Sequence, residues 1–266
     1  MSVGSNVWAS GTAYEQYVGR WSRRVAAEFL RWLGTPRGVA WLDVGCGTGA
    51  LTETILQLLD PQSVVGIDRS QPYIQQVRDR APDPRARFVV SDGQQLPLRP
   101  EITDVAVSGL VLNFMSRPEA MLAEMTRVVR REGMVAAYVW DYAGQMQLMR
   151  YFWDAAVALN PSAAELDEGR RFPICKPQQL EMLFRDAGLA HVESRGIDVP
   201  TRFENFDDYW SPFLGGQGPA PGYTVSLSEE ERAELRERIH RALPVRADGS
   251  IDLIARAWAV RGSKSA

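Results

Sequence analysis

The chain is poor in the side chains that metal and thiol chemistry require. Its 266 residues include only two cysteines, Cys46 and Cys175, and two histidines, His191 and His240. The cysteines have no CxxC spacing and are too few for a disulfide framework or a cysteine-rich zinc site. The histidines fall at a strand start and beside the apolar stripe of a charged helix, where structural or solvated histidines are commoner than general bases. We therefore expect no metal and a reducing, cytoplasmic setting.

Long apolar runs and an excess of positive charge are also missing. No apolar stretch reaches membrane-spanning length, and the polar start of the chain lacks the basic-then-apolar pattern of a signal peptide. The formal net charge is −3 and the pI is near 5.6, so the chain offers no general attraction for a phosphate backbone or an anionic membrane. The expected partner is a small molecule, with neither nucleic acid nor membrane, and the oligomeric state stays open.

The remaining composition is that of an ordinary globular protein, with 45% hydrophobic and 24% charged residues. The apolar spacing predicts an N-terminal helix over 13–33, and strands then alternate with helices. Such alternation predicts an α/β fold with a doubly wound, mostly parallel sheet covered on both faces. The expected strands are 39–44, 63–67, 87–91, 103–108 and 134–140, and the helix that follows Pro118 is expected to stop at Gly133.

The regular alternation breaks after Asp141. A helix over 177–188, a strand over 191–199 ended by Pro200, and a last strand over 251–260 predict an antiparallel edge strand. Two aromatic insertions interrupt them; the second is expected to hold a flexible segment over 215–222 and a helix opened by the capping box Ser226-x-x-Glu229. The expected parts are an N-terminal helical segment (1–36), the core (37–141), a helical cap insertion (142–175), a core helix and strand (176–200), a second cap insertion (201–249) and the final strand and tail (250–266).

A glycine motif stands where the first strand meets its helix. Residues 42–49 read LDVGCGTG, which lets the backbone turn tightly and lets a ligand approach it closely. Asp68 ends the second strand nineteen residues after Gly49, where a carboxylate can accept both ribose hydroxyl hydrogens. Asp92 and Gly93 follow the third strand at the same sheet edge. Together they indicate a nucleoside-containing ligand.

The segments LDVGCGTG, VVGIDRS and FVVSDGQQLPL resemble the first three motifs of class I S-adenosylmethionine-dependent methyltransferases, particularly the type 11 and ubiquinone-biosynthesis-like group. The resemblance spans about 39–141. It implies a Rossmann-like, seven-stranded fold, the cofactor S-adenosyl-L-methionine, and methyl transfer by in-line displacement. It further implies that the methionine portion lies along the glycine motif, the ribose at Asp68, the adenine at Asp92 and Gly93, and the sulfonium above the end of the fourth strand. The implied cofactor-binding residues are Tyr17, Trp21, Asp43, Gly45, Cys46, Gly47, Gly49, Asp68, Arg69, Asp92, Gly93, Ser108, Gly109 and Asn113.

Two other classes of function compete with this interpretation. The spacing Gly45-x-Gly47-x-x-Ala50 also fits the dinucleotide fingerprint of an NAD(P)-dependent oxidoreductase, and a nucleoside-binding protein without catalysis would need the same core. Cys46 is expected to contribute its backbone and no reactive thiol. No catalytic residue is identified, because methyl transfer needs neither a nucleophilic side chain nor a metal. Four aromatic residues of the insertions are candidates for the acceptor pocket: Trp140, Trp153, Trp210 and Phe213. The acceptor, and whether its oxygen, nitrogen or carbon is methylated, stays open.

Overall fold

A computed structural model describes residues 19–80, 83–216 and 218–266 of the chain. The chain divides into two compact units. The core unit consists of 22–139, 174–197 and 257–266, and the helical unit of 140–173 and 198–256 together with the described residues up to Trp21. Two long strands contribute residues to both units.

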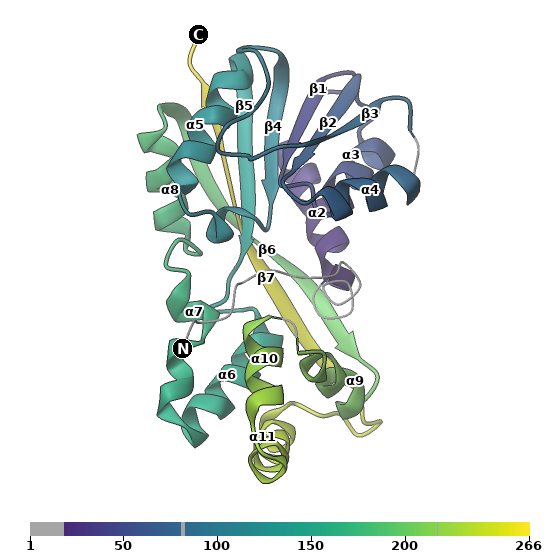
Figure 1. Ribbon diagram of the computed structural model, residues 1–266, viewed down its shortest axis with the longest axis vertical. Helices are drawn as coiled ribbons and strands as arrows, with labels where there is room; N and C mark the ends of the chain where they lie inside the picture. Colours follow the sequence, from purple (N-terminus) through teal and green to yellow (C-terminus); the bar gives the residue numbers. More distant parts are fainter. Residues whose placement is uncertain (1–18, 81–82, 217) are drawn as a thin grey trace. The chain divides into compact units, whose positions relative to one another are not determined.

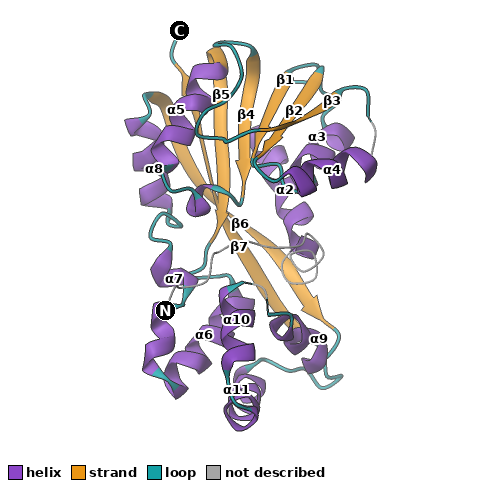
Figure 2. Cartoon of the chain, in the orientation of Figure 1, coloured by secondary structure: helices purple, strands orange, loops and turns teal. Residues whose placement is uncertain are grey.

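The strands form one seven-stranded sheet (Figure 2). The order is β3-β2-β1-β4-β5-β7-β6; β1 pairs in parallel with β2 and β4, β2 with β3, and β4 with β5, while the β7–β6 edge pair is antiparallel. The expected doubly wound, mostly parallel sheet with an antiparallel edge is confirmed. The strands are β1 (Ala40–Val44), β2 (Ser63–Asp68), β3 (Ala86–Val90), β4 (Thr103–Gly109), β5 (Val129–Trp140), β6 (Leu189–Phe203) and β7 (Ile251–Lys264).

Helices flank the parallel strands of the core unit (Figure 1). Each buries one apolar stripe: α5 buries Met121, Leu122, Met125 and Val128, as its spacing predicts. Phe29 of α2 packs on Tyr138 of β5, with 4.7 Å between ring centroids. The expected helix over 13–33 is seen from Arg20 onward, and its first part lies outside the described residues. The helices are α2 (Arg20–Leu33), α3 (Ala50–Leu58), α4 (Gln71–Arg80), the short η2 (Leu112–Phe114), α5 (Pro118–Val128) and α8 (Pro177–Asp186).

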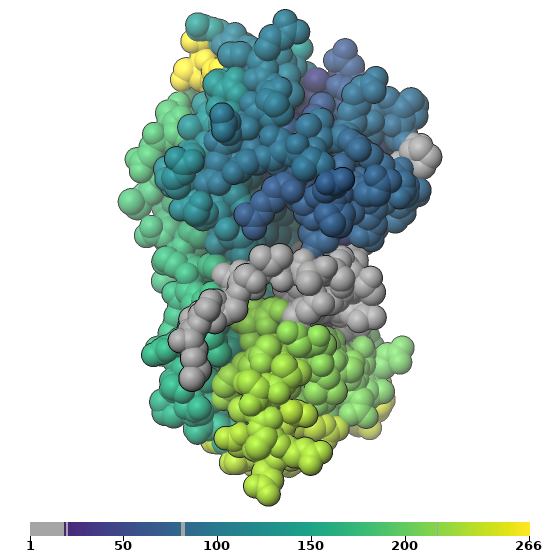
Figure 3. Space-filling view, viewed as in Figure 1, coloured from purple at the N-terminus to yellow at the C-terminus, as the bar shows by residue number. Residues whose placement is uncertain are grey.

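The helical unit has its own aromatic core. Phe152 stacks on Phe213 at 4.5 Å between centroids, and Tyr209 packs on both Phe203 and Phe213. The charged helix α11 lies on the surface of this unit (yellow-green in Figure 3), and only Leu235 and Ile239 are buried along it. The elements are α6 (Gln147–Leu159), η3 (Pro161–Glu165), α7 (Glu168–Arg171), α9 (Phe206–Trp210), η4 (Ser211–Leu214), α10 (Pro219–Ser226) and α11 (Glu229–Ala242).

The expected helix end at Gly133 is wrong. Helix α5 ends at Val128 and β5 begins at Val129, where the pairing with β4 shifts register between Thr103 and Val105. A Cβ on Gly133 would lie 2.6 Å from the carbonyl oxygen of Asp104, so this glycine permits the close approach of two strands. Gly133 therefore does not cap a helix. It lies in the irregular pairing of β4 and β5.

Pro200 does not end its strand, because β6 continues to Phe203. β6 is an edge strand, where a residue without an N–H leaves no ladder bond unmade, and Pro200 is exposed. Residues 201–203, which open the expected second insertion, are thus part of β6.

The capping box was also misplaced. The Ser228 hydroxyl accepts from the N–H of Glu231, and the Glu231 carboxylate accepts from the N–H of Ser228, so α11 begins at Glu229. Ser226 instead ends α10, and its hydroxyl donates to the carbonyl of Tyr223. Because α10 begins at Pro219, the later part of the segment expected to be flexible is helical. Among the described residues, no helix is long and apolar enough to cross a membrane.

Candidate functional site

The sheet reverses its winding between β1 and β4, the two central strands. In doubly wound sheets such a switch point opens a crevice outside the carboxyl ends of the strands, where ligands bind. β1 is followed by the glycine loop (residues 45–49), and β4 by the segment 108–114. β2 and β3 end at the same edge with Asp68 and, just beyond the strand, Asp92. Strand order thus brings together the four segments that the sequence singled out.

The main-chain N–H groups of the glycine loop are largely bound within the protein. Those of Gly45 and Cys46 donate to the carbonyl of Ile67 at 2.7 and 3.0 Å, that of Gly47 to the Asp68 carboxylate at 2.9 Å, and that of Gly49 to the carbonyl of Cys46. A dinucleotide-binding loop needs free N–H groups to hold a pyrophosphate. This loop therefore fits a ligand that places no phosphate there.

Gly45 lets the glycine loop and the segment after β4 lie in contact. Its φ is +78°, and a Cβ at this position would lie 2.5 Å from Cγ2 of Val111. Gly47, with φ +53°, would meet nothing within 4 Å. Both need the left-handed conformation, but only Gly45 also needs the space, because Val111 of the segment after β4 packs against it.

Asp43 lies beneath this loop and is 1% exposed. Its carboxylate accepts from the hydroxyl of Thr52 at 2.6 Å, and burial raises its pKa to about 7. Among the described residues no cationic side chain pairs with this carboxyl, so it suits the arrival of a positively charged ligand group, whose charge would favour the ionised form. Burial, together with the charges of Asp43 and Asp68, raises the pKa of the buried Cys46 thiol well above its usual range, which fits the expectation of an unreactive cysteine.

Asp68 joins the second strand to the glycine loop. One oxygen accepts from Gly47 N, and the other accepts from Ser70 N at 2.8 Å, at the start of α4. A carboxylate has about four acceptor positions, so the bonds among the described residues leave two for hydroxyl groups of a ligand. Asp68 therefore caps the start of α4 and can still accept from a ligand.

Asp92 is exposed and held by Gln94. It accepts from the Gln94 N–H at 2.9 Å and from the side-chain amide, and the first of these bonds is the main cause of its lowered pKa. A Cβ on Gly93 would lie 2.7 Å from the side chain of Val44, so this turn packs on the end of β1. Arg69 is exposed beside Asp68. The Asp92 carboxylate is thus ionised and oriented at the sheet edge.

The end of β4 holds buried polar atoms without partners. Among the described residues, nothing bonds to Oγ of Ser108 or to Oδ1 and Nδ2 of Asn113, although both side chains are buried. Between them, Leu110 adopts φ +63°, which is unusual for a residue with a side chain. Unsatisfied buried groups and backbone strain are commonly found where a ligand binds. This segment therefore has the hydrogen-bonding capacity for a polar ligand.

Comparison with known proteins supports the nucleoside-containing ligand that the sequence indicates. Residues 42–137 match the type 11 family model described as a methyltransferase domain. A demethylmenaquinone methyltransferase of Roseiflexus castenholzii is 29% identical over 172 residues, 59% of this chain and 71% of that one. A trans-aconitate 2-methyltransferase of Variovorax paradoxus is 26% identical over 240 residues, 85% and 87% of the two chains.

The chain is a class I S-adenosylmethionine-dependent methyltransferase of type 11. Its fold is shared with a phosphoethanolamine N-methyltransferase of Haemonchus contortus, solved with S-adenosylhomocysteine. That likeness has a TM-score of 0.61 and 16% identity and covers 96% of this chain and 57% of the other.

The remaining candidate residues of the methyltransferase lie in the helical unit or outside the described part. Tyr17 lies outside the described residues. Trp21 is buried edge-on against Phe203 at 5.3 Å. The four acceptor candidates Trp140, Trp153, Trp210 and Phe213 are all buried, at 5% exposure or less. They form the interior of their unit, and their contact with an acceptor stays a prediction.

Two of these aromatic residues belong to polar features that the sequence did not reveal. Nε1 of Trp140 has no partner among the described residues. Nε1 of Trp153 donates to the carboxyl group of Glu168, which is 3% exposed, and burial raises the pKa of Glu168 to about 7. No motif marks Glu168, because its burial arises from the packing of α7 on α6.

Sequence reasoning also missed residues of the methyltransferase core that hold the predicted ones. Thr52 binds Asp43, Gln94 orients Asp92, and Val111 requires Gly45 to be glycine. Tyr73 lies near Asp68, and burial raises its pKa first, with the Asp68 charge as a second cause. No spacing rule links Thr52 to Asp43, because the contact crosses the glycine loop between β1 and α3. Among the described residues, no group of three or more histidine, cysteine or carboxylate side chains is placed to hold a metal.

Proposed function

We propose that the methyltransferase transfers a methyl group to a small molecule by in-line displacement, with the cofactor held at the switch point of the core unit. The observation that carries this proposal is the set of buried polar atoms at the end of β4 that have no partner among the described residues, Ser108 Oγ and both amide atoms of Asn113, in a strand that pairs with β1, the strand of Asp43. Bound S-adenosylmethionine supplies a methyl group on a positively charged sulfur.

The residues would share the binding of the cofactor as follows. Asp68 would accept from the ribose hydroxyls with its two remaining acceptor positions, and Asp92 with Gly93 would contact the adenine. Asp43, with Gly45, Cys46, Gly47 and Gly49, would lie along the methionine portion. Ser108, Gly109 and Asn113 would lie near the sulfonium, where the Asn113 carboxamide offers both a donor and an acceptor. Arg69, Tyr17 and Trp21 complete the proposed set.

The proposed mechanism asks the protein for position and for exclusion of water. A displacement at a methyl carbon needs the acceptor atom in line with the breaking carbon–sulfur bond, and holding two reactants in that geometry is a large part of the acceleration. The protein's own part would be to hold the acceptor atom in that line and to let any proton that the acceptor atom loses leave the site. We propose that the helical unit, with Trp140, Trp153, Trp210 and Phe213, serves the acceptor. Its aromatic composition suits an apolar or aromatic molecule.

We further propose a cytoplasmic protein that acts on neither nucleic acid nor membrane lipids. The net charge of −3 supports this, since binding a phosphate backbone generally needs a basic surface.

The first test is ligand binding. We expect S-adenosylhomocysteine to bind in calorimetry and to raise the melting temperature, because a ligand selective for the native state stabilises it by mass action. NADH should do neither, because the loop N–H groups are engaged. A shift with NADH and none with S-adenosylhomocysteine would refute the cofactor assignment.

The second test identifies the acceptor. Purified enzyme and S-adenosylmethionine are incubated with a metabolite library and, in parallel, with tRNA, and release of S-adenosylhomocysteine together with a methylated product is measured. We expect turnover only with a library member. Methylation of tRNA alone would contradict the small-molecule proposal while leaving the cofactor assignment intact.

A further inference from the structure

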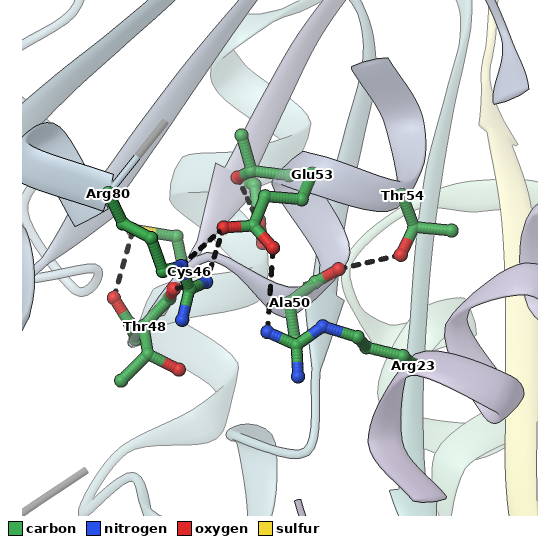
Figure 4. A network of polar contacts seen from close by, with 10 residues as sticks. Arg23, Cys46, Thr48, Ala50, Glu53, Thr54 and Arg80 are labelled. Atoms are coloured by element: carbon green, nitrogen blue, oxygen red, sulfur yellow. Dashed lines mark hydrogen bonds and ion pairs between the residues drawn. The ribbon is translucent and has the colours of Figure 1, made fainter. Parts of the chain in front are cut away.

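An ion-pair network lies against the glycine loop in the core unit, and neither the motifs nor the cofactor assignment includes it. Glu53 stands in the first turn of α3 with 16% of its side chain exposed, between Arg23 of α2 and Arg80 of α4 (Figure 4). Its position at a helix N-terminus favours a negative charge. Three helices of one unit therefore meet at a single carboxylate.

Arg80 connects this carboxylate to the loop itself. Its Nε donates to Oε1 of Glu53 at 2.9 Å, and its Nη2 donates both to the same oxygen and to the carbonyl oxygen of Thr48 at 2.6 Å. Thr48 lies between Gly47 and Gly49 and is 8% exposed. Because the guanidinium is planar, its bonds to Glu53 also orient Nη2 toward the Thr48 carbonyl of the loop.

Arg23 holds the other oxygen of the carboxylate. Its Nη2 lies 3.4 Å from Oε2 of Glu53, so both carboxylate oxygens have a cationic partner. Rotation of Glu53 away from Arg80 would break the contact with Arg23 as well. The network thereby restrains the rotamer that Arg80 needs in order to reach Thr48.

The loop needs such an external tether. Three of its five residues are glycines with positive φ, a conformation with little steric cost for glycine and a large loss of backbone freedom on ordering. Its N–H groups bond to Ile67 and Asp68 at the end of β2 and within the loop, and α4 holds it at the Thr48 carbonyl.

We propose that Arg80 and Glu53 are positioning residues, which hold the glycine loop in its cofactor-binding conformation and so determine affinity for the amino-acid portion of the cofactor. This inference rests on the proposed function, in which that portion lies along the loop. The adenosine portion lies at Asp68 and Asp92 and depends less on the Thr48 contact.

The test compares two ligands in calorimetry: S-adenosylhomocysteine, and 5′-methylthioadenosine, which lacks the amino-acid portion. We expect Arg80→Ala to weaken S-adenosylhomocysteine binding about tenfold, since a charge-assisted hydrogen bond is lost, and to change methylthioadenosine binding less than about threefold. Arg80→Lys keeps the positive charge but cannot bond to Glu53 and Thr48 through one planar group. Its affinity for S-adenosylhomocysteine should lie between those of Arg80→Ala and wild type. Glu53→Gln should weaken binding in wild type and add little in the Arg80→Ala background, because the two residues act through one contact.

Arg78→Ala is the matched control. Arg78 lies on the same helix, and its guanidinium donates to the carbonyl of Phe88 on β3 instead of to a carbonyl of the loop. It should leave both affinities unchanged. Equal loss for both ligands in Arg80→Ala, or no loss in folded Arg80→Ala and Glu53→Gln, would overturn the positioning role. Failure of the wild-type protein to bind S-adenosylhomocysteine would instead refute the proposed function.

Discussion

At the scale of the residue, Asp68 has two roles that a substitution can separate. It holds Gly47 N and Ser70 N within the protein and is proposed to bind the ribose. We expect Asp68→Ala to weaken S-adenosylhomocysteine binding by about 1.5–3 kcal/mol, because hydrogen bonds to a charged group are lost. Calorimetry measures this, with Asp79→Ala, an exposed carboxylate of α4, as the control. Unchanged affinity in a folded Asp68→Ala variant would assign Asp68 to structure alone.

Glu168 predicts a pH dependence of stability. Its folded pKa of about 7 lies above the ordinary value of 4.5, so between those values the folded state holds a proton that the unfolded state has released. The unfolding free energy therefore falls as pH rises through this window. Glu168→Gln has no proton to lose and can still accept from Trp153. We expect the variant to melt higher than wild type at pH 8 and nearly the same at pH 5.

Melting temperatures across pH 5–8 measure this difference directly. Asp43, whose pKa is also raised to about 7 by burial, contributes equally to both proteins and cancels in the comparison. A melting difference that does not change with pH would mean that Glu168 is not protonated in the folded protein at neutral pH.

At the scale of the element, the contact between the glycine loop and the segment after β4 predicts that two glycines differ in their tolerance. Gly45→Ala places a methyl group 2.5 Å from Val111, whereas Gly47→Ala meets open space, and both suffer left-handed strain. We expect Gly47→Ala to cost about 1 kcal/mol in unfolding free energy and Gly45→Ala clearly more. Denaturant unfolding measures both. Val111→Ala should recover part of the loss in the Gly45→Ala background and none in Gly47→Ala.

The same contact joins the loop after β1 to the segment after β4. Strand order places them side by side at the switch point, and the missing side chain at position 45 lets the two loops touch. If the two glycine variants proved equally stable, or if Val111→Ala rescued neither, the close packing would not be what position 45 requires.

At the scale of the whole molecule, the division into two units predicts a division of labour. The core unit holds every proposed cofactor contact in the described chain apart from Trp21, and the helical unit holds the aromatic candidates. We expect Trp210→Ala to lower turnover or raise the KM of the acceptor found in the library screen. S-adenosylhomocysteine affinity should stay within about 0.5 kcal/mol, provided the fold survives.

Because Trp210 is 5% exposed and packs on Phe206 and Phe213, the conservative variant Trp210→Phe serves as the control for packing. It should keep the melting temperature near that of wild type while still changing acceptor KM. A loss of cofactor affinity as severe as the loss of acceptor recognition, or no change in either, would show that the units do not divide the task.

The sequence by itself determined the order of strands and helices in the core and the place of the glycine loop among them. A strand, a glycine turn and a helix can be predicted from residues that are neighbours in the sequence. The positive φ angles of Gly45, Gly47 and Gly49 also depend on the local chain. Asp68 and Asp92 could be predicted because parallel strands deliver their carboxyl ends to one edge. The family resemblance and the seven-stranded sheet followed from the same local signals.

Only the tertiary structure decided what depends on partners distant in the chain. Gly133 looks like a helix cap until β4 lies beside it, and Pro200 looks like a strand end until β6 is known to be an edge strand. The unpartnered amide of Asn113, the buried Glu168 and the bond from Arg80 to Thr48 likewise leave no trace in spacing or composition. Burial and hydrogen bonding are set by which surfaces meet in space, and a one-dimensional pattern does not contain that information.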